Sequence, residues 1–211
     1  MHPQEKNCTA IDAECTHEVQ FRGMCAVCFK DLTIITSGGA AAPKATISMT
    51  HDSLGVFVSE KTAEKLERET AQRLKREQKL SLILDLDQTL IHATIDQTVG
   101  EWLADDGSNL DYPELKDVHK FTLPESPIIY YIKLRPGTLE FLAKASKLYE
   151  MHIYTMGTRA YADAVAKIID PTGHLFIDRI LSRDTSGSFQ EKRIGRIFPG
   201  EGEKMAVVVD D

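Results

Sequence analysis

Four aspartates follow short apolar segments, and their positions predict that they meet at one edge of a sheet. Asp85 and Asp87 come directly after the run Leu-Ser-Leu-Ile-Leu, and Asp210 and Asp211 come directly after Ala-Val-Val-Val. Such runs are typical of strands that are buried on both faces. Because ligands bind outside the carboxyl ends of the strands in an open α/β sheet, we expect these carboxylates to share one site.

The residue types at these strand ends suit phosphoryl transfer. Clustered carboxylates require a cation, and a set of oxygen ligands suits Mg²⁺, which also pairs with substrate phosphate. Asp85 can attack as a nucleophile, while Asp87 can protonate the leaving oxygen and later activate water. Thr155 follows a third candidate strand and adds a hydroxyl. Because the transferred group also needs positive charge, Lys192 and Arg135 are the candidate cations.

The elements that hold these residues alternate between strand and helix. Strand-forming runs lie at 80–84, 128–132, 151–154 and 206–209. Between them, apolar residues from 161 to 169 and from 139 to 149 recur at helical spacing. This alternation predicts an α/β layer fold with a largely parallel sheet and helices on its faces.

Composition divides the chain into four regions. Residues 1–35 hold all four cysteines, and 36–58 are rich in Ser, Gly, Ala and Thr, which predicts a linker. Residues 59–79 lack Gly and Pro and are dense in charged residues, which predicts a solvated helix. Residues 80–211 form the α/β domain, and the polar stretch 95–125 interrupts it as an insertion.

The cysteine-rich region has the spacing of a zinc site. Cys15 and His17, followed by Cys25 and Cys28, form the pattern C-x-H-x₇-C-x₂-C. Two pairs of soft ligands separated by a short loop suit tetrahedral Zn²⁺. Cys8 could replace His17, and four free thiols are the alternative without metal. If zinc binds, four protein ligands leave no open position, so its role is structural.

Charge and hydropathy exclude some classes of partner. The formal charge of −7 over 211 residues argues against a nucleic-acid contact spread over the surface. No apolar run approaches the roughly 20 residues that span a bilayer, and the N-terminal residues lack the order of a secretory signal. We therefore expect no membrane contact and a place in the cytosol or nucleus, where thiols stay reduced.

The run Asp85-Leu86-Asp87-Gln88-Thr89 matches an Asp-x-Asp-x-Thr signature, and the chain thereby resembles the haloacid dehalogenase superfamily. Further segments are similar to the branch that acts on the C-terminal repeat domain of RNA polymerase II, in particular its larger, TFIIF-associated members. They are 84–92, 133–137, 153–159, 182–184 and 207–211. The similarity runs from about residue 79 to the end of the chain and is weaker around the cysteines.

The resemblance implies roles for the aspartates and a fold. It implies a haloacid dehalogenase-type, Rossmann-like domain in which Asp85 is the nucleophile and a Mg²⁺ ligand. Asp87 is the implied general acid and base, and its backbone carbonyl also serves the metal. Asp210 and Asp211 align with the acidic pair on the metal side.

The resemblance also implies roles for Thr155 and for the basic residues Lys192 and Arg135. Thr155 aligns with the hydroxyl that holds phosphate, although a helix N-cap is its ordinary role. Lys192 aligns with the lysine that offsets charge on the transferring group, and Arg135 matches an arginine that faces phosphate or substrate. The sequence by itself leaves other cations near Lys192 open, namely Arg193, Arg196 and Lys204.

The function implied by the resemblance is a nuclear, Mg²⁺-dependent protein serine/threonine phosphatase. Its implied partners are the phosphorylated repeat domain and TFIIF, with no direct nucleic-acid contact. Because family members continue past the acidic pair, we expect a fragment or a shortened product.

Two alternatives stay open. One is a small-metabolite phosphatase, which a narrow closed pocket would favour over an open groove beside 95–125. The other is a non-catalytic adaptor that docks on transcription proteins.

Overall fold

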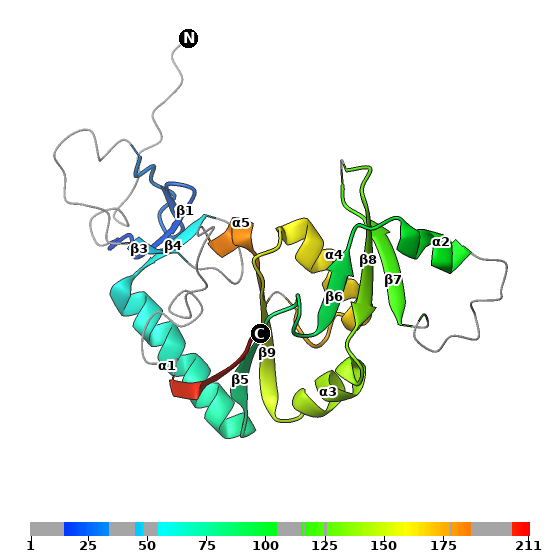
Figure 1. Ribbon diagram of the computed structural model, residues 1–211. Helices are drawn as coiled ribbons and strands as arrows, with labels where there is room; N and C mark the ends of the chain where they lie inside the picture. Colours follow the sequence, from blue (N-terminus) through cyan, green and yellow to red (C-terminus); the bar gives the residue numbers. More distant parts are fainter. Residues whose placement is uncertain are drawn as a thin grey trace, which may run out of the picture. The chain divides into compact units, whose positions relative to one another are not determined.

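The computed structural model describes most of the chain as two compact units (Figure 1). The described residues are 15–33, 45–48, 55–104, 115, 117–124, 126–177, 179–186 and 204–211. Unit 1 comprises Met1–Thr70 with Ile194–Gly202, and unit 2 comprises Ala71–Arg193 with Glu203–Asp211. No described helix is both long enough and apolar enough to cross a bilayer.

A four-stranded parallel sheet forms the centre of unit 2, in the order β10-β9-β5-β11. Its strands are β5 (Leu80–Leu84), β9 (Tyr149–Tyr154), β10 (Ile180–Leu181) and β11 (Ala206–Val209). The last four residues of β5 are all buried, as expected for an inner strand covered on both faces. Together with the helices between its strands, this parallel sheet confirms the predicted α/β class.

A second, antiparallel sheet lies in the same unit, in the order β6-β8-β7. Its strands are β6 (Ile91–Thr94), β7 (Val118–Thr122) and β8 (Ile129–Leu134). Ile91, Ile132 and Leu134 join the apolar core that also contains Leu82 and Leu84 of β5, so both sheets share one core. The polar stretch 95–125 contributes β7 and the helix α2 (Thr98–Ala104), so part of this predicted insertion is built into a sheet.

Two helices of unit 2 pack against this core. In α4 (Arg159–Ile169), Tyr161, Val165 and Ile169 are buried at the predicted spacing. Helix α3 (Thr138–Ala145) is shorter than the predicted 139–149 pattern, because Tyr149 begins β9 and pairs with Leu80. The prediction that Tyr149 is helical is therefore wrong. Its aromatic ring suits a strand as well as a helix face, and pairing with β5 decides between them.

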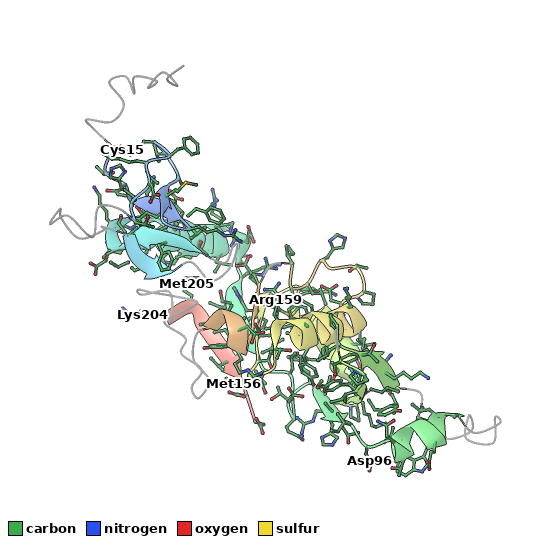
Figure 2. All side chains as sticks on the ribbon, turned by 90° about the horizontal axis from the view of Figure 1, so that it is seen from above. Cys15, Asp96, Met156, Arg159, Lys204 and Met205 are labelled. Atoms are coloured by element: carbon green, nitrogen blue, oxygen red, sulfur yellow. The ribbon has the colours of Figure 1, made fainter. Side chains whose placement is uncertain are left out.

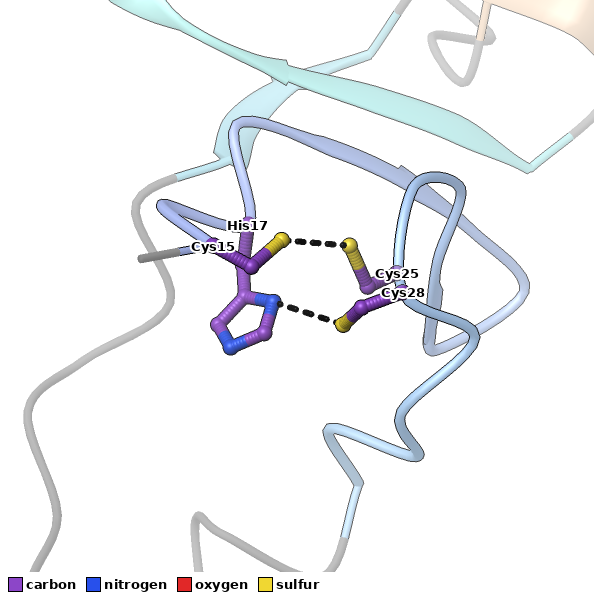
Figure 3. A group of neighbouring side chains, drawn as sticks. All are labelled: Cys15, His17, Cys25 and Cys28. Carbon is purple, nitrogen blue, oxygen red and sulfur yellow. Dashed lines mark hydrogen bonds between the residues drawn. The ribbon is translucent and has the colours of Figure 1, made fainter. Parts of the chain in front are cut away.

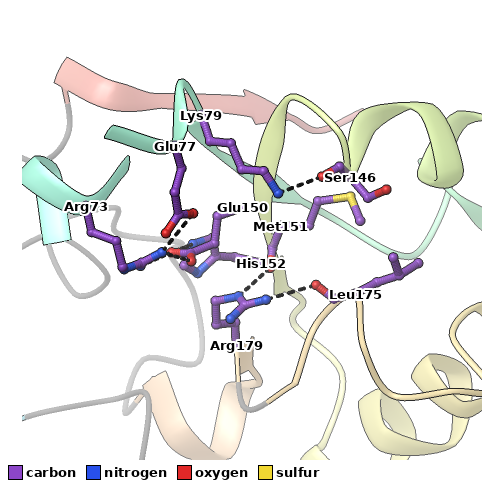
Figure 4. Close-up of polar contacts among 9 residues, drawn as sticks. All are labelled: Arg73, Glu77, Lys79, Ser146, Glu150, Met151, His152, Leu175 and Arg179. Carbon is purple, nitrogen blue, oxygen red and sulfur yellow. Dashed lines mark hydrogen bonds and ion pairs between the residues drawn. The ribbon is translucent and has the colours of Figure 1, made fainter. Parts of the chain in front are cut away.

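A layer of polar contacts holds the end of α1 (Glu60–Glu77) and the loops against β9 within unit 2 (Figure 4). Arg73 forms an ion pair with Glu150, 2.8 Å from Nη1 to Oε2. The Lys79 ammonium donates to the Ser146 carbonyl oxygen at 2.9 Å. Arg179 donates to the carbonyl oxygens of Met151 and Leu175. These charged side chains thus provide donors for backbone carbonyl and carboxylate oxygens beside the sheet.

Unit 1 contains an antiparallel sheet in the order β2-β1-β4-β3. Its strands are β1 (Val19–Phe21), β2 (Met24–Cys25), β3 (Ala45–Ser48) and β4 (Val56–Ser59). The prediction of a linker over 36–58 is therefore wrong for its described part, which contributes β3 and most of β4. The small and polar residues there flank short β-branched runs, and the burial of Ala45 and Val58 turns those runs into strands.

Candidate active site

Parallel pairing of β5 with β11 brings together three of the predicted metal ligands. Leu84 pairs with Val209, so the next residues, Asp85 and Asp210, leave the same edge of the sheet. The Asp85 N–H donates to the Val209 carbonyl oxygen at 3.1 Å. One carboxylate oxygen from each of Asp85, Asp210 and Asp211 lies within 4.8 Å of the other two.

The chemistry of this acidic group fits Mg²⁺. Its donors are all carboxylate oxygens, and their mutual repulsion disfavours the cluster without a cation. Asp85 is 7% exposed, whereas Asp210 and Asp211 are exposed. A site with one buried and two exposed carboxylates leaves positions for waters and for a substrate phosphate, as Mg²⁺ requires.

Asp87 is positioned by a tight turn and by a tyrosine from α4. After β5, the Leu86 carbonyl oxygen accepts the N–H groups of Leu90 and Ile91, and Gln88 has a positive φ of 63°. This turn carries Asp87 away from the strand, and its carboxylate is not part of the three-aspartate group. The Tyr161 hydroxyl donates to Asp87 Oδ1 at 2.6 Å.

The Tyr161 phenol stays protonated across the working pH of an enzyme. Burial raises its pKa most, and the hydrogen bond to Asp87 raises the pKa further, because a phenolate would face a carboxylate. The hydroxyl is therefore a permanent donor to the Asp87 carboxylate. Oδ1 of Asp87 is held by this bond, which leaves Oδ2 to exchange a proton.

Thr155 lies directly after β9, next to Asp85 along the sheet edge, and is only 1% exposed. Its Oγ1 accepts the Gly157 N–H at 3.0 Å, which leaves the hydroxyl proton available for a ligand. The N-cap of α4 is Thr158, whose side chain accepts the Tyr161 N–H at 3.3 Å. The ordinary capping role considered for Thr155 thus belongs to Thr158.

The structure describes only some of the predicted cations. Arg135 Nη1 donates to the Thr89 carbonyl oxygen at 3.3 Å, and the Arg135 N–H donates to the Leu90 carbonyl oxygen at 3.0 Å. The guanidinium therefore supports the turn that carries Asp87, and its contact with phosphate stays a prediction. Lys192, Arg193 and Arg196 lie outside the described residues. Lys204 is described and exposed.

An open pocket of about 640 Å³ adjoins Asp87. Its lining residues are Asp87, Ala93, Thr94, Ile95, Leu123, Tyr130, Met156, Gly157, Thr158, Tyr161 and Arg183. The loop that contributes Met156 runs from the end of β9 to Arg159 at the start of α4 (Figure 2). The Tyr130 ring stacks on Phe121 with centroids 5.6 Å apart and lies 5.8 Å from the Tyr161 ring. One wall is therefore aromatic.

Sequence reasoning did not assign Tyr161, Tyr130 or Arg183 to a functional site, although all three line this pocket. The helical spacing of Tyr161 predicted that its ring is buried in the core, but it gave no indication that the hydroxyl contacts Asp87. Tyr130 lay in a strand-forming run without any motif. Arg183 lay in a segment of family similarity, 182–184, and that segment was the one available signal.

The second candidate ligand group lies in unit 1 (Figure 3). One donor atom from each of Cys15, His17, Cys25 and Cys28 lies within 4.8 Å of the other three. These donor types and this separation could hold a metal ion. Cys8, the alternative to His17, lies outside the described residues.

Comparisons with known proteins point to one family. The model of the NLI interacting factor-like phosphatases matches residues 80–211. The chain is 54% identical over 202 residues to an RNA polymerase II C-terminal domain phosphatase of Schizosaccharomyces pombe, covering 93% of this chain and 28% of that protein. A human protein of the same description is 40% identical over 203 residues, covering 93% of this chain and 20% of that protein.

The solved structures show the same fold. A structure of Fcp1, described as an essential RNA polymerase II CTD phosphatase, is 59% identical with a TM-score of 0.63, covering 68% of this chain and 40% of that one. This similarity confirms the expected haloacid dehalogenase-type fold. The chain spans less than a third of the length of the two curated relatives described above.

Proposed function

Because the chain belongs to the NLI interacting factor-like phosphatase family, we propose that it hydrolyses phosphoserine and phosphothreonine esters through a covalent intermediate on Asp85. The observation that carries this proposal is the meeting of Asp85, Asp210 and Asp211 at the carboxyl ends of two paired strands, with Asp87 beside them on a fixed turn. The family supports the reaction class, and the geometry of the aspartates supports the choice of residues.

The proposed reaction has two steps. A carboxylate oxygen of Asp85 forms a bond to phosphorus while the bond from phosphorus to the seryl oxygen breaks, and Asp87 gives that oxygen its proton. In the second step Asp87 takes a proton from water, and the water oxygen attacks phosphorus. Phosphate leaves, and the Asp85 carboxylate is restored. The Tyr161 hydroxyl keeps Asp87 in one orientation through both steps.

The remaining predicted residues bind charge in this proposal. Asp85, Asp210 and Asp211, with the Asp87 backbone carbonyl, would hold Mg²⁺, which when bound offsets the negative charge of the carboxylates and the phosphoryl oxygens. Thr155 donates its hydroxyl proton to a phosphoryl oxygen. Lys192 and Arg135 keep their proposed roles as phosphate-facing cations, on the strength of the family similarity.

We propose a phosphorylated peptide as the substrate, specifically the C-terminal repeat domain of RNA polymerase II. The pocket beside Asp87 is open to solvent and has an apolar, aromatic wall, which suits an extended chain better than a small metabolite. The relatives with this substrate in their descriptions match nearly the whole chain. The proposed place of action is accordingly the nucleus, and TFIIF as a partner stays a prediction.

The test is phosphate release from a phosphoserine heptad-repeat peptide, with and without Mg²⁺. We expect release by the 211-residue chain only with Mg²⁺, and its loss in Asp85→Asn. Glu140→Gln is the matched control, because it makes the same carboxylate-to-amide change on the exposed face of α3, where Glu140 pairs with Lys144. This control should keep full activity.

A second substrate separates the reaction class from the substrate class. Activity on an aryl phosphate without activity on the peptide would contradict the proposed substrate and favour a metabolite. Peptide hydrolysis that survives in Asp85→Asn would contradict the proposed nucleophile. Inactivity on both substrates in the presence of Mg²⁺ would favour the adaptor function.

A further inference from the structure

Two donor–donor distances in the Cys/His group of unit 1 match those of a tetrahedral zinc site. Zn–S bonds of about 2.3 Å and Zn–N bonds of about 2.0 Å place tetrahedral ligands about 3.8 Å apart for two sulfurs and about 3.5 Å apart for sulfur and nitrogen. Cys15 Sγ and Cys25 Sγ lie 3.6 Å apart, and Cys28 Sγ and His17 Nδ1 lie 3.5 Å apart (Figure 3).

These four residues flank a short hairpin. The strands β1 and β2 are joined by Arg22 and Gly23, which have φ angles of 48° and 83°, as a two-residue turn between antiparallel strands requires. Two ligands precede β1, one ends β2, and one follows in the next turn. A metal here would link both open ends of the hairpin.

The backbone around Cys25 is arranged for a bound thiolate. The Val27 N–H donates to Cys25 Sγ at 3.4 Å, and the Phe29 N–H closes the turn on the Cys25 carbonyl oxygen at 3.0 Å. An N–H group directed at the sulfur supports it as a metal ligand, because donors around a metal site orient the ligand atoms.

The described residues of unit 1 include few buried apolar side chains that could order this hairpin. They are Cys25, Leu32, Ala45, Val58 and Ala63. Cys25 is itself a ligand, and the neighbouring Phe29 is 76% exposed. Small units with thin cores are usually held by disulfides or metals, and a structural zinc contributes its binding free energy directly to folding.

We propose that Cys15, His17, Cys25 and Cys28 bind one structural Zn²⁺, which ties the segment before β1 to the turn after β2. Three thiolates and one imidazole are the donors of closed zinc sites, and four protein ligands leave no position for substrate. This site is separate from the acidic group of unit 2 and does not depend on the phosphatase proposal.

The experiment measures metal on the whole chain, purified under reducing conditions without chelator. After dialysis against Mg²⁺, we expect one zinc per chain by elemental analysis. Replacement by Co²⁺ should give the intense visible absorption of tetrahedral cobalt together with thiolate charge-transfer bands.

Variants assign the ligands. Cys28→Ser should lose most of the zinc, whereas His17→Cys should keep the zinc and strengthen the charge-transfer band through a fourth thiolate. Cys8→Ser and Asp85→Asn are the matched controls, and both should keep one zinc per chain. His17→Cys keeps the proposal testable if Cys28→Ser fails to fold.

Three results would overturn the proposal. The first is zinc-free protein whose reduced thiols give no tetrahedral cobalt spectrum. The second is an intact mass that shows a disulfide between Cys15 and Cys25 in freshly prepared protein. The third is loss of zinc in Cys8→Ser together with its retention in His17→Ala, which would replace the proposed ligand set.

Discussion

Tyr161 shows how one side chain serves both packing and chemistry. Its ring lies in the core of unit 2 and against the rings of Phe121 and Tyr130, while its hydroxyl holds Asp87. Gly157 is part of the same arrangement, because a Cβ at that position would lie 2.6 Å from Tyr161 Cδ1. The absence of a side chain at 157 therefore lets the phenol reach Asp87.

Removing the Tyr161 hydroxyl should slow the reaction without unfolding the protein. A hydrogen bond to a charged group contributes about 1.5–3 kcal/mol, so we expect kcat of Tyr161→Phe to fall at least about tenfold. KM for an aryl phosphate should change little, because the ring stays in place. The melting temperature should fall by only several degrees, as expected for the loss of one hydrogen bond. Steady-state kinetics and thermal unfolding measure these quantities.

Two further variants sharpen this prediction. Tyr131→Phe is the matched control, because it removes a tyrosine hydroxyl that contacts Gln97 at 3.4 Å instead of Asp87, and it should keep kcat. Gly157→Ala should lower kcat by displacing the intact Tyr161 ring. An unchanged kcat in Tyr161→Phe would mean that the turn alone positions Asp87.

At the scale of the element, Asp170 closes the C-terminal end of α4. Its carboxylate accepts the N–H groups of Leu175 and Phe176, at 2.7 and 3.2 Å, and the N–H of His174. Burial raises the pKa of Asp170, but these donors outweigh it, and the net effect lowers that pKa. The ionised carboxylate is therefore favoured in the folded state and anchors the loop that leads to β10.

This arrangement predicts how stability depends on pH. The pKa of Asp170 is lower in the folded protein than in the unfolded chain. Asp170 therefore stabilises the fold fully above the unfolded-state pKa of about 3.9, and this stabilisation is lost as pH falls through the folded-state pKa. We expect Asp170→Asn to lower the free energy of unfolding by about 1–3 kcal/mol at pH 7. The difference from wild type should shrink below about pH 4.

Urea unfolding at several pH values measures this dependence. Asp96→Asn is the control, because hydrogen bonds from Thr98 also lower the pKa of Asp96, but that carboxyl is exposed at the start of α2. It should change stability little at any pH. A stability difference for Asp170→Asn that stays constant from pH 7 to acid would show that the carboxylate charge is not involved.

At the scale of the whole molecule, the two candidate metal groups belong to different units. Each unit has its own sheet or sheets and its own buried residues, and among the described residues the apolar cluster of unit 2 contains none from unit 1. The acidic group draws on β5 and β11, whereas the Cys/His group surrounds β1 and β2. Loss of one metal should therefore act on one unit.

Selective removal of zinc in excess Mg²⁺ tests this separation. We expect amide hydrogen exchange to rise in β1 and β2, because their hairpin loses its link. Exchange in β5 and β9 should stay slow, because these strands belong to the core of unit 2. Peptide-level exchange with mass spectrometry measures both. An equal rise in both units would show that they unfold together.

The local sequence pattern was sufficient to predict the features that depend on the spacing of apolar residues or on which residues follow a strand. The apolar runs before Asp85 and Asp210 predicted two strands, and parallel pairing follows from the alternation with helices. The spacing from 161 to 169 predicted the buried face of α4. The same logic predicted that four aspartates meet at this edge, because residues after neighbouring parallel strands leave one edge of the sheet. Three of them do meet there, whereas the turn after β5 keeps the Asp87 carboxylate out of the group.

The sequence by itself therefore determined the α/β class, the acidic group and the Cys/His spacing. Each of these depends on residues close together in the chain, or on the rule that residues after neighbouring parallel strands meet at one edge of the sheet. Only the tertiary structure decided that Tyr161 holds Asp87, that Thr158 rather than Thr155 caps α4, and that part of 36–58 forms strands. A periodic pattern says which face of an element is buried, but the partner on that face is chosen by packing across the fold. For the same reason, the hydrogen-bond partner of a polar side chain is known only once the two elements that carry the partners have been positioned in the fold.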